Sequence, residues 1–221
     1  MSIVQTPAVA EKPQRLVLHN VDWRTYSRLL RALDERHLRL TYDRGTLEIM
    51  TLTHEHESDA PFLGRLAVTL TEELGFPIKV GRSTTFRRRQ KERGLEPDDC
   101  YWIASEPLVR GKRKIDLKVD PPPDLAIEVD ITRSSLNRMS IYASLSVPEV
   151  WRYKGKVLTF NELQADGSYA VIAHSKAFPL ISPADLMKFL PMREQMDENA
   201  VIRQFREWVR QRIAAGDAGK A

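Results

Sequence analysis

The sequence lacks most of the features that stabilise small secreted proteins or anchor membrane proteins. Cys100 is the single cysteine among 221 residues, so neither a disulfide framework nor a cysteine-based zinc site can form within one chain. Five histidines are present, but none of their spacings matches a zinc protease motif. No apolar run approaches about 18 residues, and the N-terminus contains no apolar stretch typical of a signal peptide. We therefore expect a cytoplasmic protein without a membrane-spanning segment.

Charge and hydrophobic content are typical of a globular chain rather than a disordered one. Hydrophobic residues make up 42% of the sequence and charged residues 29%. The formal net charge is +4, which permits an anionic partner without requiring one. The length suits one domain with extensions. We expect a flexible N-terminal tail over residues 1–15 and a single domain over residues 16–221 that ends in a helical extension.

Hydrophobic periodicity predicts helices and strands in alternation. Apolar residues recur at helical spacing over 20–37, 54–76, 134–146, 182–190 and 198–215. Strands are expected at 38–50 (as a hairpin), 78–89, 96–104, 124–131, 147–163 and 165–175. This order favours the α/β class, in the form of a mixed β-sheet flanked by helices.

Acidic residues gather on one of these strands. Side chains of a strand alternate between its faces, so Asp124, Glu128 and Asp130 share one face of the strand at 124–131. Buried carboxylates are costly unless a cation meets them. If this strand pairs antiparallel with the preceding one, Asp98 lies near Glu128 and Asp130. Two carboxylates at a strand end supply the hard oxygen ligands that Mg²⁺ prefers, and such an ion can activate water for phosphodiester hydrolysis.

Three stretches are together similar to those of a known family: LEPDDCYWI, PPPDLAIEVD and NRMSIYASLSVPEVW. They resemble a bacterial family of predicted restriction endonucleases of unknown function, within the PD-(D/E)XK superfamily. The resemblance implies a restriction endonuclease-like mixed β-sheet flanked by helices. Asp98 and Glu128 match the family's metal-binding carboxylates, and Glu57, preferred to Glu55, matches an acidic residue early in a helix. The implied activity is an endonuclease that uses Mg²⁺ or Mn²⁺ to hydrolyse phosphodiester bonds, in DNA rather than RNA.

The chain departs from the superfamily pattern at two positions. The lysine of the motif would fall at residue 130, where this sequence has Asp130. In the family that the chain resembles, the lysine lies in the next helix, four residues before a tyrosine, and Arg138 stands at that place before Tyr142. Arginine can hold a phosphate and stabilise a transition state, but it hardly ever deprotonates. Asp130 is then an extra metal ligand or orients Arg138. The alternative function is a catalytically degenerate nucleic-acid-binding or protein-interaction module on a nuclease fold.

Other features allow two interpretations each. The basic clusters at 87–93 and 110–114 either neutralise nucleic-acid phosphates or are solvated loops. The helix around Trp208 docks either on the core or on a second subunit, and the resemblance makes a homodimer the expected assembly. Asp98 and Glu128 could also form an ordinary surface pair. We expect Asp124 to bond backbone N–H groups and Asp99 to be solvated.

Overall fold

The computed structural model describes residues 14–33, 38–51, 54–82, 84–130 and 134–216 and, for residues 54–57, the backbone alone. The described part contains six α-helices, two 3₁₀-helices and eleven strands, which confirms the predicted α/β class. The strands are β1 (Arg15–Leu18), β2 (Leu38–Asp43), β3 (Thr46–Thr51), β4 (Lys79–Val80), β5 (Phe86–Arg88), β6 (Arg93–Leu95), β7 (Asp99–Trp102), β8 (Leu125–Asp130), β9 (Glu149–Lys154), β10 (Val157–Leu163) and β11 (Tyr169–Ile172). The helices are α1 (Trp23–Ala32), α2 (His54–Leu74), η1 (Arg89–Lys91), α3 (Glu106–Val109), α4 (Arg138–Leu145), α5 (Pro183–Met187), η2 (Pro191–Glu194) and α6 (Glu198–Ala214).

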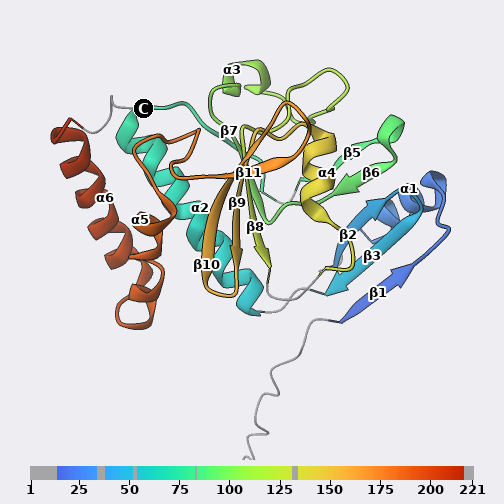
Figure 1. Cartoon of the computed structure of the whole chain (residues 1–221), viewed down its shortest axis with the longest axis horizontal. Helices are drawn as coiled ribbons and strands as arrows, with labels where there is room; N and C mark the ends of the chain where they lie inside the picture. Colours follow the sequence, from blue (N-terminus) through green and yellow to red (C-terminus); the bar gives the residue numbers. More distant parts are fainter. Residues whose placement is uncertain (1–13, 34–37, 52–53, 83, 131–133, 217–221) are drawn as a thin grey trace, which may run out of the picture.

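The strands form two sheets (Figure 1). The first has the order β1-β3-β2-β6-β5, and all of its pairs are antiparallel. The second has the order β11-β10-β9-β8-β7-β4 and is mixed, because β8 runs parallel to β9 but antiparallel to β7. The chain passes from β8 to β9 through α4, since parallel strands need a crossover connection. The antiparallel pairing predicted for β7 and β8 is confirmed.

Strand β8 separates two hydrophobic cores. Leu125, Ile127 and Val129 point to one side and pack with α2, which in turn packs against α6 (Figure 1). Ala126 points to the other side, into a core that α4 covers. The alternation predicted from the sequence is therefore confirmed, and Glu128 lies on the α4 face with Ala126.

The strand predicted at 78–89 is wrong as a single element. Its two ends are β4, in the mixed sheet, and β5, in the antiparallel sheet. The chain changes direction between them at Gly81 and Arg82, and Arg82 has a φ of +48°. A Cβ at residue 81 would lie 2.5 Å from the Sγ of Cys100, so this close approach requires glycine. β1, β6 and α3 were not predicted, because each is too short to show a hydrophobic period.

The described part of the chain begins with β1 and ends with α6. The predicted tail at 1–15 lies outside the described residues except for Gln14 and Arg15, and β1 begins at Arg15. At the other end, α6 buries Phe205 and Val209 in the core beside α2. Of the two docking partners predicted for this helix, the core is confirmed.

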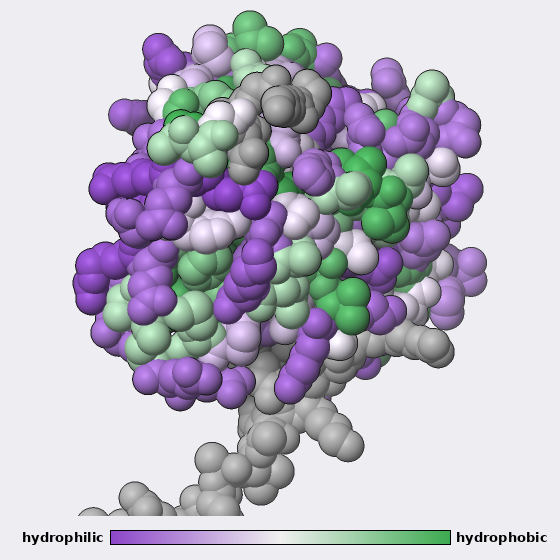
Figure 2. Space-filling model, turned by 60° about the vertical axis from the view of Figure 1, so that its left-hand side comes forward, coloured by the Kyte–Doolittle hydropathy of each residue, from purple (hydrophilic) through white to green (hydrophobic). Residues whose placement is uncertain are grey.

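The surface carries no large hydrophobic stripe on the face drawn in Figure 2. Hydrophilic side chains cover much of that face, and hydrophobic ones lie between them (Figure 2). Single exposed hydrophobic residues are ordinary on globular proteins. Within the described part of the chain, no helix combines the length and hydropathy needed to cross a bilayer.

Candidate active site

Asp98 and Glu128 lie where β7 and β8 meet. In the antiparallel pair, Asp99 stands opposite Ile127. The backbone N–H of Asp98 donates to the Ile127 carbonyl at 3.2 Å. Two residues further along β8, the N–H of Val129 donates to the Asp98 carboxylate, Oδ2, at 2.5 Å. The Asp98 side chain therefore continues the hydrogen-bond ladder beyond the end of β7, which fixes it at the edge of β8 beside Glu128.

Helix α4 supplies the groups that bind Glu128. Arg138 forms an ion pair through Nε with Glu128 Oε1, and its Nη2 donates to Oε2 at 2.9 Å. The hydroxyl of Tyr142 donates to the same Oε2 at 2.6 Å. Residues four apart on a helix lie on the same face, one turn from each other. The spacing of Arg138 and Tyr142 in the sequence is thus what lets both reach one carboxylate.

Arg138 also joins the two sheets. Its Nη1 donates to the hydroxyl of Thr41, in β2, at 2.6 Å, and its Nη2 donates to the backbone carbonyl of Glu96 at 2.7 Å. The side chain is 9% exposed. A guanidinium presents five donors in a fixed plane, so one side chain can satisfy three acceptors that come from different elements.

A second arginine neutralises Asp98. Arg39, in β2, forms an ion pair with Asp98 Oδ1, and both residues are buried. Glu128 and Arg138 both act electrostatically on Arg39, so these four residues belong to one buried cluster. We call Asp98, Glu128, Arg39 and Arg138 the charge quartet. Its two positive and two negative charges cancel, which makes the burial of each tolerable.

The pKa values of the quartet follow from burial and from opposite charges. For Glu128, burial opposes ionisation, but the Arg138 guanidinium and its hydrogen bonds outweigh it and hold the pKa below the ordinary value. For Arg138, burial favours the neutral form, but Glu128 outweighs it and raises the pKa. Burial, followed by repulsion from Arg138, lowers the pKa of Arg39. At neutral pH we take Glu128 as an anion held by a permanent cation.

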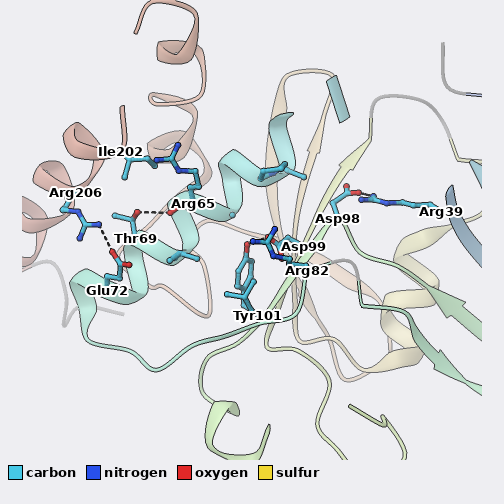
Figure 3. Close-up of a pocket in the computed structure, with 15 residues that line it drawn as sticks. Arg39, Arg65, Thr69, Glu72, Arg82, Asp98, Asp99, Tyr101, Ile202 and Arg206 are labelled. Atoms are coloured by element: carbon cyan, nitrogen blue, oxygen red, sulfur yellow. Dashed lines mark hydrogen bonds and ion pairs between the residues drawn. The ribbon is translucent and has the colours of Figure 1, made fainter. Parts of the chain in front are cut away.

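Asp98 also lines a pocket of about 810 Å³ between α2 and the start of β7. Figure 3 shows Asp98 and Arg39 at one end of this pocket and Glu72 with Arg206 at the other. Asp99 lies between them and is half-buried, so it is less solvated than predicted (Figure 3). Its Oδ2 accepts a hydrogen bond of 2.5 Å from the Tyr101 hydroxyl, and burial raises its pKa.

The remaining candidate residues lie outside this cluster or outside the described side chains. Asp130 accepts hydrogen bonds from Arg152 of β9, at 2.7 Å from Nε and 2.5 Å from Nη2. Glu57 belongs to the first turn of α2, and its side chain lies outside the described residues. Asp124 accepts from the N–H of Ile103 at 2.6 Å, which confirms its predicted role as a ligand of backbone N–H groups.

The carboxylate pair has the donor chemistry of a Mg²⁺ or Mn²⁺ site. Asp98 and Glu128 provide hard oxygen atoms on neighbouring strands, as the predicted site requires. No group of three or more histidine, cysteine, aspartate or glutamate side chains suited to a metal is present among the described residues. Further ligands would be backbone carbonyls, water, substrate, or side chains outside the described residues, such as that of Glu57. Arg39 and Arg138 occupy the carboxylate oxygens, so they have to yield when a cation binds.

Three contributors to the cluster were not predicted as part of it: Arg39, Thr41 and Tyr142. The hairpin pattern placed Leu38, Leu40 and Tyr42 on one face of β2, which leaves Arg39 and Thr41 on the other. An arginine between apolar residues of a strand reads as solvent-facing. In the structure β2 is almost entirely buried, but this burial comes from the partner sheet, so the local sequence carries no signal of it.

Cys100 has no part in this chemistry. It is buried, its thiol donates to the Arg82 carbonyl at 3.3 Å, and burial raises its pKa well above the ordinary value. A protonated, inaccessible thiol is a poor nucleophile.

Comparison with known sequences identifies a family. The profile of a family described as "Uma2: Putative restriction endonuclease" matches residues 23–193, which is most of the chain. The matched region contains both strands that carry the carboxylates, helix α4 and helix α2. No curated protein sequence matches the chain.

Proposed function

The chain belongs to the Uma2 family, and on that premise we propose that it is a metal-dependent endonuclease that hydrolyses phosphodiester bonds in DNA. One observation carries the proposal beyond the family description. Asp98 and Glu128, which are far apart in sequence, lie on paired strands, and Arg138 binds Glu128 from the following helix. Two carboxylates beside a fixed cation are the groups that phosphodiester hydrolysis needs.

Asp98 and Glu128 are the residues that would hold Mg²⁺ or Mn²⁺, and we propose Glu57 as a third contributor from α2. When bound, such an ion supplies a more acidic water and neutralises charge on the phosphate. Asp98 is fixed for this task by the N–H of Val129, which holds one of its oxygens. Glu128 is fixed by Tyr142. Both carboxylates are therefore held in place before substrate binds.

Arg138 is the residue that we propose to contact the scissile phosphate. Its guanidinium stays protonated in this environment, so it cannot act as a base and serves instead as a fixed positive charge. If Glu128 and Asp98 held a dication, Arg138 and Arg39 would be less strongly neutralised by these carboxylates, and Arg138 would be available to pair with the phosphate. The charge that builds up on the phosphorus oxygens in the transition state is stabilised by such a cation.

Asp130 has a supporting place in this proposal. Its carboxylate contacts Arg152, whose Cα stands beside that of Glu128 in the parallel pair of β8 and β9. We propose that Asp130 steadies the end of β8 by this contact. A variant such as Asp130→Asn should then lower activity less than Asp98→Asn does.

Cleavage of nucleic acid tests the proposal. Supercoiled plasmid, single-stranded DNA and RNA are incubated with the purified protein in Mg²⁺, in Mn²⁺ and in EDTA. We expect cleavage of DNA that needs the metal and that falls by roughly a hundredfold or more in Asp98→Asn and in Glu128→Gln. Circular dichroism and thermal unfolding of both variants control for folding, and Lys154→Gln, on the exposed end of β9, is the surface control. Absence of metal-dependent cleavage of every substrate by the unmodified protein would contradict the proposal.

A second candidate function has an observation of its own. The carboxylates of the charge quartet are already paired with Arg39 and Arg138, so the cluster is neutral without any added ion. This arrangement favours a degenerate nuclease fold that binds nucleic acid or protein without cutting. Calorimetric titration with Mn²⁺ separates the two functions: binding that Asp98→Asn abolishes supports the nuclease, and no binding up to millimolar Mn²⁺ supports the degenerate module.

A further inference from the structure

The second large pocket of the molecule is strongly basic. It has a volume of about 820 Å³ and lies between α1, β4–β5 and the loop that follows α3. Among the described residues that line it, eight are lysine or arginine, and Asp116 is the single acidic one. We call this pocket the basic groove. Its cations come from four segments: Arg31 on α1, Lys79 on β4, Arg87 and Arg89 around β5, and Lys112, Arg113, Lys114 and Lys118 in the loop.

The groove unites the two basic clusters noted in the sequence. Residues 87–93 and 110–114 lie on either side of β7 in the chain, and members of both line the groove. Lys79 of β4 holds the second cluster in place, since its Nζ donates to the Lys112 carbonyl at 2.8 Å. Two solvated loops would have no reason to meet. Here both line one concavity, which concentrates positive charge where the surface is hollow.

The charge of the groove is not balanced by the protein. Lys112 pairs with Asp120, but no carboxylate of the described residues forms an ion pair with Arg89, Arg113 or Lys114. The pocket beside Asp98 is different, because three of its four arginines (39, 65 and 206) are each paired with an acidic residue. An unbalanced cluster of exposed cations calls for an anionic partner, whereas a balanced one does not.

The basic groove adjoins the candidate active site. Val80 lines both pockets. Thr85, which lines the groove, donates to Glu96 Oε1 at 2.7 Å, and the Glu96 carbonyl accepts from Arg138. A polyanion that follows the groove would therefore arrive next to the charge quartet.

We propose that the basic groove binds the phosphate backbone of DNA and leads it to Asp98 and Glu128. The identity of the polymer as DNA rests on the proposed function. That the groove binds a polyanion is inferred from its charge and shape alone. Binding is through phosphates rather than bases, because the aromatic rings that line the groove are engaged: Phe86 and Trp102 are buried, and Trp23 packs on Tyr26 and Tyr42. Binding should thus be independent of sequence and sensitive to salt.

Binding is measured in EDTA, so the result does not depend on cleavage. Fluorescence anisotropy of a labelled 20-base-pair duplex gives the Kd of the unmodified protein, of Arg113→Glu/Lys114→Glu, and of the control Lys154→Glu/Arg203→Glu. The control makes the same change of net charge on exposed residues outside the groove. We expect about tenfold or greater loss of affinity in the groove variant and about twofold in the control.

Salt dependence gives a second readout. In Arg113→Gln/Lys114→Gln, the slope of log K against log salt should become shallower by about one for each phosphate contact that is lost. Thermal unfolding of each variant shows whether the fold is intact.

The possible outcomes separate this proposal from the nuclease proposal. DNA binding that depends on the groove, without cleavage, supports the groove and contradicts the nuclease. Cleavage with equal affinity in the groove and control variants contradicts the groove alone. Absence of DNA binding, or tighter groove-dependent binding of an RNA duplex of the same length, overturns the assignment of DNA as the partner.

Discussion

Among single residues, Arg138 combines the largest number of roles. It binds Glu128, Thr41 and the Glu96 carbonyl with one planar group. A lysine concentrates its charge and its donors on one nitrogen, so it can neutralise Glu128 but cannot reach all three acceptors at once. The choice of arginine at this position thus favours a rigid site over one that can transfer protons.

Two replacements of Arg138 should distinguish the contribution of its charge to stability from the contribution of its hydrogen bonds. We expect Arg138→Lys to lower the free energy of unfolding by roughly 1–3 kcal/mol, because buried acceptors lose their donors. Arg138→Met should lower it by roughly 3–5 kcal/mol, because Glu128 is left as a buried charge without its main partner. Urea denaturation measures both values, and Arg203→Lys and Arg203→Met on the exposed face of α6 are the controls. Equal stability of the lysine and methionine variants would show that the ion pair contributes little.

Asp99 should make stability depend on pH. Burial raises the pKa of Asp99 in the folded protein above the ordinary value of 3.8, so the folded state holds this proton more tightly than the unfolded state does. The free energy of unfolding then decreases as pH rises from about 3.8 through the higher folded-state pKa, and it stays lower above it. Asp99→Asn removes this ionisation, while the amide can still bond with Tyr101.

The variant should consequently unfold at the same or a higher temperature than the unmodified protein at neutral pH. Below the ordinary pKa of an aspartate, the difference between the two proteins should disappear, since Asp99 is protonated in both states. Thermal unfolding across a pH series measures this. A lower unfolding temperature for Asp99→Asn at neutral pH would mean that the contacts of the carboxylate outweigh its burial.

The sequence could predict some of the site residues and not others. Asp98 and Glu128 were predictable, because strand alternation and the pairing of neighbouring strands place them together. Arg39 and Thr41 were not, because the contact of Thr41 with Arg138 spans 97 residues and depends on how two sheets meet. Asp130 followed the same local logic as Glu128, but its partner Arg152 comes from a parallel strand that lies beyond α4.

At the scale of elements, α2 lies so close to β7 at Gly64 that no residue with a Cβ fits there without a shift of its neighbours. A Cβ at Gly64 would lie 2.4 Å from the Tyr101 hydroxyl and 2.8 Å from Asp99 Oδ2. Glycine inside a helix costs up to about 1 kcal/mol relative to alanine. The helix accepts this cost because its backbone lies against the Asp99–Tyr101 pair, which borders the pocket beside Asp98.

Gly64→Ala should therefore destabilise the protein in spite of its better helix propensity. Overpacking costs roughly 1–3 kcal/mol, which exceeds the gain from alanine. The same change in a Tyr101→Phe background removes the nearest obstacle and should cost less. Denaturation of the four proteins gives the coupling energy between the two positions. Additive effects would show that the Cβ and the hydroxyl do not meet.

Long periodic elements were predictable and short ones were not. Hydrophobic periods in the sequence mark the helices α1, α2, α4 and α6 and the strand β8. Each of these elements is long enough, at six residues or more, for its period to repeat. The stretch at 78–89 also looked continuous, but Gly81 and Arg82 redirect the chain into a second sheet. Gly81 is required there because Cys100 and Trp102 lie directly against it, and these contacts belong to the tertiary structure.

At the scale of the whole molecule, the charge quartet lies at the junction of the two sheets. Arg39 belongs to the antiparallel sheet, and Asp98 and Glu128 lie at the mixed one. Arg138 contacts both sheets. The site is therefore also a connection between the two halves of the fold, so that its chemistry and the cohesion of the molecule depend on the same residues.

Arg39→Met should loosen this junction. Removal of one partner of a buried ion pair costs roughly 3–5 kcal/mol. Because the lost contact joins β2 to β7 and β8, we expect amide hydrogen exchange to accelerate more in β1, β2 and β3 than in α6. The control is Arg44→Met, which removes an exposed pair with Asp43 worth at most about 1 kcal/mol. Uniform acceleration throughout the chain would show that the two sheets open together rather than at the junction.

The contact between Thr41 and Arg138 has a consequence for the protein while it is being synthesised. Ribosomes add about 5–20 residues per second, so residue 138 appears roughly 5–20 s after residue 41. During that interval Thr41 has no Arg138 to contact, so this link between β2 and α4 cannot form. A nascent chain shorter than Tyr142 cannot hold Glu128 in place. The charge quartet and its Tyr142 contact would thus be complete only after most of the polypeptide has been synthesised.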